Sequence, residues 1–273
     1  MFKVKFYGTR GSTPVCDRNY QAFGGNTSCI SILREDDNRI SIIDAGTGIR
    51  KLGKEMVKST DHQKIITIGF THFHWDHIQG FPFFLPAYSL HTRLNILSVG
   101  KTDDTELRSI LEAQMHSEFF PIPLEKMGGK FSFTNLGGDK VDVNGVGIQI
   151  IEQSHPGISY GIRAELNGKA LVICTDLEHN PDISEDIVEF CKDADLLIHE
   201  AQYTDEELKS KIGWGHSSYS QAMEVAERAN AKMLVMTHHD PDHDDEFLKK
   251  QEKICQDRLK DCELAREGVV FHI

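Results

Sequence analysis

Three histidines and one carboxylate fall within six residues of this chain, at His72, His74, Asp76 and His77. They follow the apolar, β-branched run 65–68, which predicts a buried strand. Alternate side chains of an extended segment point the same way, so His72 and His74 can share one side. Asp76 and His77 can turn in from the start of a following helix. Imidazole binds zinc, manganese, iron, cobalt or nickel, and an adjacent carboxylate favours a site for more than one divalent ion.

Three further candidate ligands, His155, Asp176 and His238, stand beside the ends of apolar, strand-like runs. Loops at one edge of a sheet bring distant parts of a chain together on a rigid frame. We therefore expect these residues to join the first cluster. The resulting seven candidate ligands are enough for two ions that share one carboxylate.

Short strand-like runs alternate with helical patterns at residues 104–118, 217–230 and 244–265. This alternation is typical of layered sheets and helices. No Pro-, Gly- or Ser-rich linker and no shift in composition divides the 273 residues. We therefore expect a single domain over residues 1–273.

On these residues the chain resembles the metallo-β-lactamase-fold hydrolases, and within them the branch of ribonuclease Z and small phosphodiesterases. The matching segments are Gly8 to Pro14, Asp44 to Gly46, His72 to His77, His155, Asp176, His199 to Ala201, Gly215 to Ser218, and Thr237 to His238. The resemblance implies an α+β fold, namely a four-layer αββα sandwich. Its two sheets would come from strand sets at residues 2–99 and 131–273, with helices outside.

The resemblance also implies two divalent ions, zinc first, with manganese or iron as alternatives. Its ligand pattern gives His72, His74 and His155 to one ion, Asp76, His77 and His238 to the other, and Asp176 to both. His238 is preferred to His239 because the family's ligand directly follows the threonine. A hydroxide held between the ions would then attack phosphorus.

His216 follows the glycine loop 213–215 and precedes a helical pattern. A helix N-terminus and an imidazolium would together favour a phosphoryl oxygen. In the ribonuclease Z branch the matching histidine stabilises the transition state or protonates the leaving group, and Glu200 belongs to a supporting motif. We therefore take His216, Glu200 and Asp76 as catalytic. A helix-start role for His216 and a purely structural role for Glu200 remain as alternatives.

Asp44 ends the strand-like run 40–43 and begins a glycine-containing turn. It can accept a hydrogen bond from a ligand imidazole, or it can simply be a turn residue. The family resemblance favours the first role. The aromatic stretch 81–88 has two interpretations as well, the wall of a substrate pocket or core.

The formal net charge of −12 bears on the substrate. Proteins that bind polynucleotides normally carry a basic stripe, and none is evident here. Only 20 residues separate His155 from Asp176, where tRNA-processing members of the family carry a long arm. We expect a small phosphodiester substrate of the cyclic nucleotide type and no stable nucleic-acid complex. The acidic run 240–246 agrees with this, or is a solvated turn and helix start.

Two other enzyme classes remain, a lactonase or thioester hydrolase of the same fold and a ribonuclease Z-like RNA-processing nuclease. His216 distinguishes the first, because acyl hydrolases of this fold usually lack its glycine-loop element. A noncatalytic metal-binding protein would require a broken ligand set, and all seven positions are filled.

The chain opens with an alternating, strand-like segment, and no apolar run approaches membrane-spanning length. We expect a cytoplasmic protein without membrane contact, and leave a homodimer open. The six cysteines show no paired spacing of a zinc or redox motif, so we expect reduced thiols. Cys255 and Cys262 are expected to share a helix face.

Overall fold

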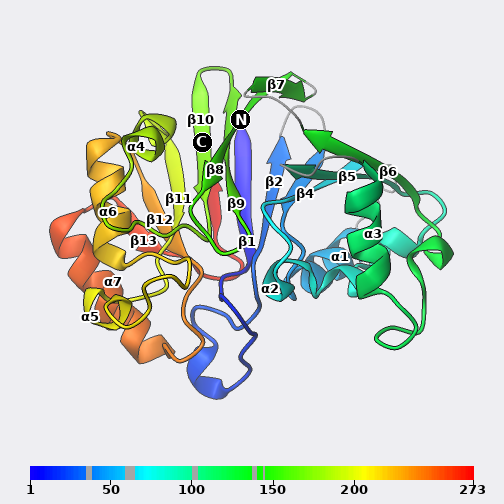
Figure 1. The fold of residues 1–273 in the computed structure, drawn as a ribbon, viewed down its shortest axis with the longest axis horizontal. Coiled ribbons are helices and arrows are strands. Elements are labelled where there is room, and N and C mark those ends of the chain that lie inside the picture. The colour runs from blue at the N-terminus through cyan, green and yellow to red at the C-terminus, as the bar shows by residue number, and fades with distance from the viewer. Residues whose placement is uncertain (35–38, 59–64, 100–103, 137–139, 144) are drawn as a thin grey trace.

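The computed structural model describes residues 1–34, 39–58, 65–99, 104–136, 140–143 and 145–273. Two seven-stranded sheets face each other in the centre of the molecule (Figure 1). The first sheet has the order β14 (Val270–His272), β1 (Phe2–Gly8), β2 (Cys29–Arg34), β3 (Ile40–Ile43), β4 (Ile65–Phe70), β5 (Arg93–Val99) and β6 (Lys130–Leu136). The second has the order β13 (Cys262–Leu264), β12 (Leu234–Thr237), β11 (Leu196–Glu200), β10 (Lys169–Cys174), β9 (Ser159–Leu166), β8 (Val146–Gln153) and β7 (Lys140–Val143).

Both sheets have the same pairing pattern, with an antiparallel part and a parallel part. In the first sheet the pairs from β14 to β3 are antiparallel and those from β3 to β6 are parallel. In the second sheet the pairs from β7 to β10 are antiparallel and those from β10 to β13 are parallel. Parallel neighbours need crossover connections, which most helices of this chain supply.

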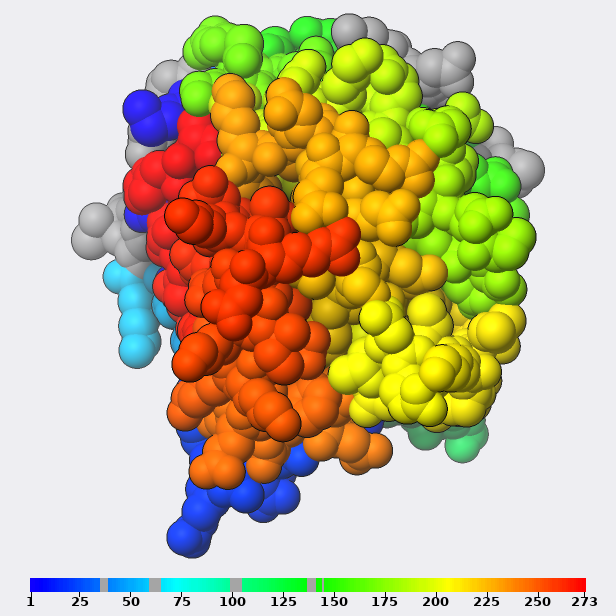
Figure 2. Space-filling model, turned by 90° about the vertical axis from the view of Figure 1, so that its left-hand side faces the viewer, coloured from blue at the N-terminus to red at the C-terminus, as the bar shows by residue number. Residues whose placement is uncertain are grey.

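Helices cover the outer face of each sheet, and Figure 2 shows α5 to α7 forming the surface over the second sheet. The helices are α1 (Ile49–Lys58), α2 (Trp75–Ile78), α3 (Asp104–Gln114), α4 (Glu185–Cys191), α5 (Asp205–Leu208), α6 (Tyr219–Arg228) and α7 (Asp245–Arg258). Short 3-10 turns are η1 (Arg18–Tyr20), η2 (Phe81–Phe83), η3 (Leu85–Tyr88) and η4 (Leu124–Lys126). Ser218 begins α6 through a capping box with Gln221, and the Asp244 side chain caps α7.

Three apolar layers hold these four structural layers together. One lies between the sheets and includes Val4, Phe6 and Ile173, all almost fully buried. The second packs the first sheet against its helices, and the third does the same for the second sheet. The predicted α+β sandwich of the metallo-β-lactamase type is therefore confirmed.

Several boundaries differ from the sequence prediction. Helix α7 ends at Arg258, and the last part of the predicted helix 244–265 is strand β13, which pairs with β12. Cys262 therefore lies in a sheet and shares no helix face with Cys255. Strands β6 and β14 join the first sheet although both fall in the second predicted strand set. Edge strands are joined by tertiary pairing, which hydropathy along the chain does not encode.

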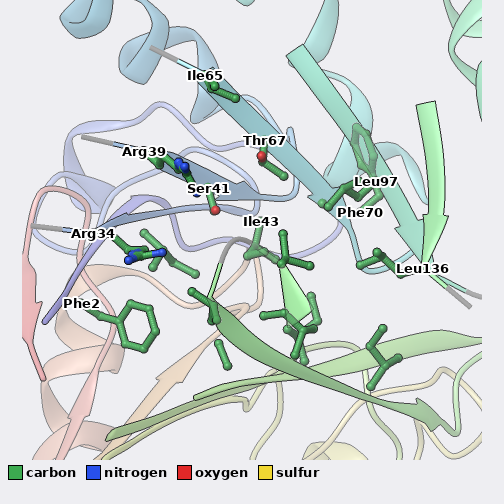
Figure 3. A pocket seen from close by; sticks show the side chains of 18 residues that line it. Phe2, Arg34, Arg39, Ser41, Ile43, Ile65, Thr67, Phe70, Leu97 and Leu136 are labelled. Atoms are coloured by element: carbon green, nitrogen blue, oxygen red, sulfur yellow. The ribbon is translucent and has the colours of Figure 1, made fainter. Parts of the chain in front are cut away.

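A hollow between the two sheets is seen from close by in Figure 3. Side chains such as Ile43, Phe70 and Leu97 line it from the first sheet, and Ile148 and Ile162 from the second. Its lining is mostly apolar and contains none of the candidate metal ligands. The chemistry is therefore placed elsewhere.

Across the part of the chain that the structure describes, no helix is long and apolar enough to cross a bilayer. All six cysteines are free thiols, as expected.

Candidate metal centre

The candidate ligands gather where strands of both sheets end, as in other folds that place ligands beyond the carboxyl ends of parallel strands. β4 ends at Phe70, and the turn before α2 carries His72 and His74. Asp76 and His77 lie within the single turn of α2. Ligands from distant sequence positions therefore meet because these strands of the two sheets end at the same edge of the sandwich.

The first cluster consists of His72, His74 and His155, whose candidate ligand atoms lie within 4.8 Å of one another. Nε2 of His155 is 3.0 Å from Nδ1 of His74. His72 is buried, His155 is half-buried and His74 is exposed. One side of this cluster is therefore open to solvent.

The second cluster consists of Asp76, His77, Asp176 and His238, all buried. Oδ2 of Asp76 lies 3.3 Å from Nε2 of His77 and 3.1 Å from Nε2 of His238. The Asp176 carboxylate lies 3.2 Å from Nε2 of His77 and 3.3 Å from Nε2 of His238. Its Oδ1 is also 3.8 Å from Nε2 of His72, so Asp176 faces both clusters.

These donors fit divalent ions. A tetrahedral zinc with bonds of about 2.0 to 2.1 Å holds its ligand atoms about 3.3 Å apart, close to the separations in the second cluster. Within the described chain, Nε2 of His72 and of His77 are buried and make no well-formed hydrogen bond. Buried polar atoms without partners are rare. Their common direction, toward Asp176, is that of ligand atoms.

The opposite nitrogen of each buried imidazole is held by an acceptor. Nδ1 of His77 donates to Oδ2 of Asp44 over 2.8 Å, and Nδ1 of His238 meets Oε1 of Gln202 at 3.0 Å. The amide of Gln202 is oriented by its own donation to the Tyr203 hydroxyl. Such partners fix the tautomer and leave Nε2 free for a metal. Asp44 therefore occupies the position expected of it.

Gln202 was not found by sequence reasoning. Its only sequence signal is its place directly after the matching segment that ends at Ala201. Thr71 was missed too, and its hydroxyl donates to the Asp44 carboxylate and lies 3.2 Å from Nδ1 of His72. The Thr71 hydroxyl thus connects Asp44 to His72 of the first cluster, whereas Asp44 contacts His77 of the second cluster directly.

The electrostatics of the two clusters differ. Burial, followed by the imidazole of His77, holds the pKa of His72 well below its usual value. Burial would also lower the pKa of His77, but the carboxylates of Asp176 and Asp76 outweigh it and raise that pKa well above its usual value. His238 and His77 keep the pKa of Asp176 low against the effect of burial. A metal at Nε2 of His77 would therefore take the place of a proton.

The N-terminal loop packs directly on the second cluster. The backbone N–H of Ser12 donates to Oδ2 of Asp76 over 2.8 Å. A Cβ on Gly11 would lie only 2.5 Å from the His238 ring, so glycine is required there. Asp44, Asp176 and His238 themselves have positive φ of 62°, 58° and 62°. The left-handed backbone turns these side chains inward at the strand ends.

His216 lies between the clusters. Its ring centroid is 5.4 Å from that of His155 and 5.1 Å from that of His238. Its Nδ1 is 3.5 Å from Oε1 of Glu200. Burial opposes a charged ring, but Glu200 and then Asp176 outweigh it and raise the pKa of His216 to about 9.

Glu200 is fully buried at the end of β11. Its carboxylate accepts the backbone N–H groups of Leu177, Gln202 and Ser217. A carboxylate so engaged orients its surroundings and has no free face for substrate. Its contacts match the structural alternative from the sequence and also place it beside His216.

The structure corrects one local prediction, the start of the helix after His216, and agrees with two others, on His239 and on the acidic run. Helix α6 begins at Tyr219, with Ser218 as its cap, two residues later than the predicted start at residue 217. His216 therefore lies in the loop before the helix and is not at its first turn. His239, the rejected neighbour of His238, donates to the Ala265 carbonyl from Nε2. In the acidic run, Asp244 caps α7 and Asp245 accepts the backbone N–H of Ala22, so the run is a turn and helix start.

The aromatic stretch 81–88 is divided between the two interpretations. Phe81 and Phe84 are fully buried in the core of the first sheet. Phe83 and Leu85 are exposed. Alternation of buried and exposed side chains along two short 3-10 turns explains this division.

A family model described as "Beta-lactamase superfamily domain" matches residues 39–239. With the fold and the His/Asp clusters, this match shows that the chain belongs to the β-lactamase superfamily as a metal-dependent hydrolase of the metallo-β-lactamase fold.

Curated relatives are similar over most of their length. A protein named Ribonuclease Z from Prochlorococcus marinus is 26% identical, with 90% of this chain and 91% of the relative covered. A Ribonuclease Z from Archaeoglobus fulgidus is also 26% identical, with 87% of each covered.

Solved structures show the same fold at low identity. The metallo-β-lactamase fold protein YhfI from Bacillus subtilis has a TM-score of 0.72 and 19% identity, with 99% of this chain and 98% of that chain covered. The short form of human tRNase Z has a TM-score of 0.69 and 22% identity, with 99% of each covered. A diphosphatase from the PhnP family has a TM-score of 0.73 and 18% identity, with 100% and 98% covered.

Proposed function

We propose that this chain is a two-metal phosphodiesterase that hydrolyses small or cyclic nucleotide-type phosphodiesters. The observation that carries the proposal is the Asp176 carboxylate, which lies within 3.8 Å of imidazole nitrogens from both clusters. A carboxylate in that place could be shared by two divalent ions. Two such ions supply a strong nucleophile at neutral pH and stabilise the entering and leaving oxygens at phosphorus.

The roles of the ligands follow from the two clusters. The first ion would be held by His72, His74 and His155, and the second by Asp76, His77 and His238, with Asp176 shared. Zinc suits these donors, and manganese or iron would suit them too. Asp44 and Gln202 would hold the rings of His77 and His238 in position.

His216 is the residue that we assign to the leaving group. The Glu200 carboxylate lies 3.5 Å from Nδ1 of His216 and favours the charged ring, so His216 can stabilise a phosphoryl oxygen or give a proton to the departing oxygen. Its place between His155 and His238 would put it near both ions. Glu200 would act as a positioning residue, because its carboxylate balances the charge of the ring and fixes the backbone at Ser217.

A ribonuclease Z-like RNA-processing nuclease is the second candidate, and the names of the curated relatives favour it. Two features support the smaller substrate. The turn between β9 and β10 consists of only Asn167 and Gly168, in the region where tRNA-processing members carry their arm. The formal net charge of −12 also opposes binding of a long polyanion.

Cleavage assays on the metal-reconstituted protein separate these candidates. The substrates are bis(p-nitrophenyl) phosphate, cyclic mononucleotides, a dinucleotide, a tRNA precursor, a lactone and a thioester, with chelator-treated protein as control. We expect metal-dependent cleavage of the small phosphodiesters and an essentially uncut tRNA precursor. Efficient 3′ processing of the precursor would establish the nuclease instead. Turnover confined to the lactone or thioester would overturn phosphodiester chemistry altogether.

A further inference from the structure

Glu178 lies two residues after Asp176 and is 8% exposed. Its carboxylate accepts the backbone N–H of Gly213 at both oxygens, over 2.8 and 2.9 Å. It also accepts the N–H of Gly215 over 2.7 Å. One side chain therefore holds both ends of the tripeptide that precedes His216.

These backbone contacts are the main compensation for the charge of Glu178. Among the residues that the structure describes, no Lys, Arg or His side chain forms an ion pair with it. Burying a carboxylate is costly unless hydrogen bonds replace its water. Hydrogen bonds to an ionised group are about twice as strong as neutral ones, so the carboxylate and the loop stabilise each other.

The loop has few other means of holding this shape. Gly213 and Gly215 have φ of +85° and +89°, a backbone conformation that residues other than glycine rarely adopt. A Cβ on Gly215 would lie 2.1 Å from Nδ1 of His155, so the backbone itself packs against this ring. The Gly215 carbonyl accepts the hydrogen of Nδ1 of His155 over 2.8 Å. The loop thereby sets the orientation of a first-cluster ligand.

The residue on the other side of His216 is also tied to a buried carboxylate. The N–H of Ser217 donates to Oε1 of Glu200 over 2.7 Å. His216 is thus fixed from before by Glu178 and from after by Glu200. Only Glu178 extends this control to His155.

We propose that Glu178 is a positioning residue that couples the glycine loop to the first metal ion. Its carboxylate fixes Gly213 and Gly215, the Gly215 carbonyl turns Nε2 of His155 toward the cluster, and the same loop places His216. The proposal rests on the proposed function for its catalytic consequence, whereas its effects on the loop and on metal binding do not depend on the substrate.

Glu178→Gln is the variant that tests this chain of contacts. The substitution keeps the size of the side chain but presents an NH₂ donor where an acceptor is needed. Glu152→Gln is the matched control, because Glu152 is an exposed acid that lines the same surface pocket as Glu178, a pocket separate from the hollow between the sheets, and it forms no hydrogen bond with either glycine. Glu178→Asp keeps the charge and shortens the reach by one methylene group.

The first measurement is hydrogen exchange of the peptide that contains Gly213 and Gly215, in the metal-free protein. Loss of a hydrogen bond to a charged group should speed its exchange by about tenfold to one hundredfold in Glu178→Gln. Glu178→Asp should fall between this variant and wild type, and Glu152→Gln should match wild type. Unchanged exchange in folded Glu178→Gln would overturn the proposal. If that variant does not fold, wild-type exchange in Glu178→Asp has the same meaning.

The second measurement is zinc binding by competition with a chelator. The first cluster includes the exposed His74, so its ion should bind more weakly than the ion of the buried second cluster. We expect this weaker-binding ion to lose about 10 to 100-fold in affinity in Glu178→Gln, and the tighter ion to be unaffected. Equal losses for both ions would contradict a specific link to His155. Cleavage of bis(p-nitrophenyl) phosphate is measured last. If wild type cleaves no phosphodiester but exchange and zinc affinity change as expected, the proposed function fails and the positioning role stands.

Discussion

The two halves of the metal centre are built differently. The second cluster is buried throughout and brings together two carboxylates, Asp76 and Asp176. The first cluster has three imidazoles, and one of them, His74, is exposed. A buried site with more negative charge should hold a dication more tightly and exchange it more slowly. We therefore expect the second cluster to fill first.

The supports of the two halves differ as well. Side chains near strand ends, Asp44 and Gln202, hold the rings of His77 and His238. A loop carbonyl, that of Gly215, holds His155. Rigid strands fix one half, whereas the other depends on how well a glycine loop is held. The comparison predicts that damage to each half can be separated experimentally, except at the shared carboxylate.

Asp176→Ala should have the largest effect. Because this carboxylate faces both clusters, its loss should empty or weaken both sites and reduce cleavage to the background rate. Metal content by mass spectrometry and the rate with bis(p-nitrophenyl) phosphate are the measurements. Two ions retained together with more than about a tenth of the rate would show that Asp176 does not bridge the halves.

His216→Ala should leave both ions in place and slow cleavage by roughly 100 to 10,000-fold, the usual range for a positioned general acid. The deficit should shrink when the leaving group is p-nitrophenolate, which needs no proton, compared with an alkoxide. Equal deficits would assign His216 to charge stabilisation alone. Wild-type rates with both substrates would remove His216 from the chemistry and leave it only a structural role before α6.

Asp44→Asn should act mainly on the second cluster, because Asp44 contacts His77 directly and reaches His72 only through the Thr71 hydroxyl. A neutral amide oxygen accepts the His77 hydrogen more weakly than a carboxylate does, so we expect a loss of about 10 to 100-fold in the affinity of the tighter ion. Zinc competition measures this, with the weaker ion as internal control. A loss confined to the weaker ion would reverse our assignment of tight and weak halves.

Asp195→Asn should have the smallest effect and serves as a control outside the centre. Asp195 precedes β11 at the end opposite Glu200 and pairs with Lys169 and Lys232. Burial would raise its pKa, but these lysines lower it from 3.8 to about 2. Its stabilising contribution is therefore present above about pH 4 and is lost as the pH falls toward 2.

Because the lysines are largely exposed, the variant should lower the Tm at pH 7 by only about 1 to 3 °C, with the difference vanishing near pH 2. Thermal unfolding monitored by circular dichroism measures it. Altered metal affinity in Asp195→Asn would mean that the effects above are not specific to the centre.

Much of this centre could be predicted because its ligands obey local rules. His72 and His74 alternate at a strand end, and Asp176 and His238 terminate apolar runs. Asp44 could be narrowed to two roles for the same reason. The sandwich followed from the resemblance and the alternation of strands and helices.

The remaining features depend on contacts that no local pattern encodes. Glu178 forms hydrogen bonds with Gly213 and Gly215, and Gln202 forms one with His238. These partners are 35 to 37 residues away in the sequence. The helical periodicity from 244 onward hid β13, because only pairing with β12 makes Cys262 part of a strand. Tertiary contacts decide such cases.

The left-handed backbone at Asp44, Asp176 and His238 has a consequence for the evolution of this protein. Each of these residues occupies a conformation that glycine adopts without strain and that aspartate and histidine adopt more readily than most other side chains, although still at some cost. Glycine at these positions would relieve the backbone strain, but it would remove the candidate ligands Asp176 and His238 and the acceptor Asp44 that holds His77. We therefore expect these residues to be retained only while catalytic turnover is under selection.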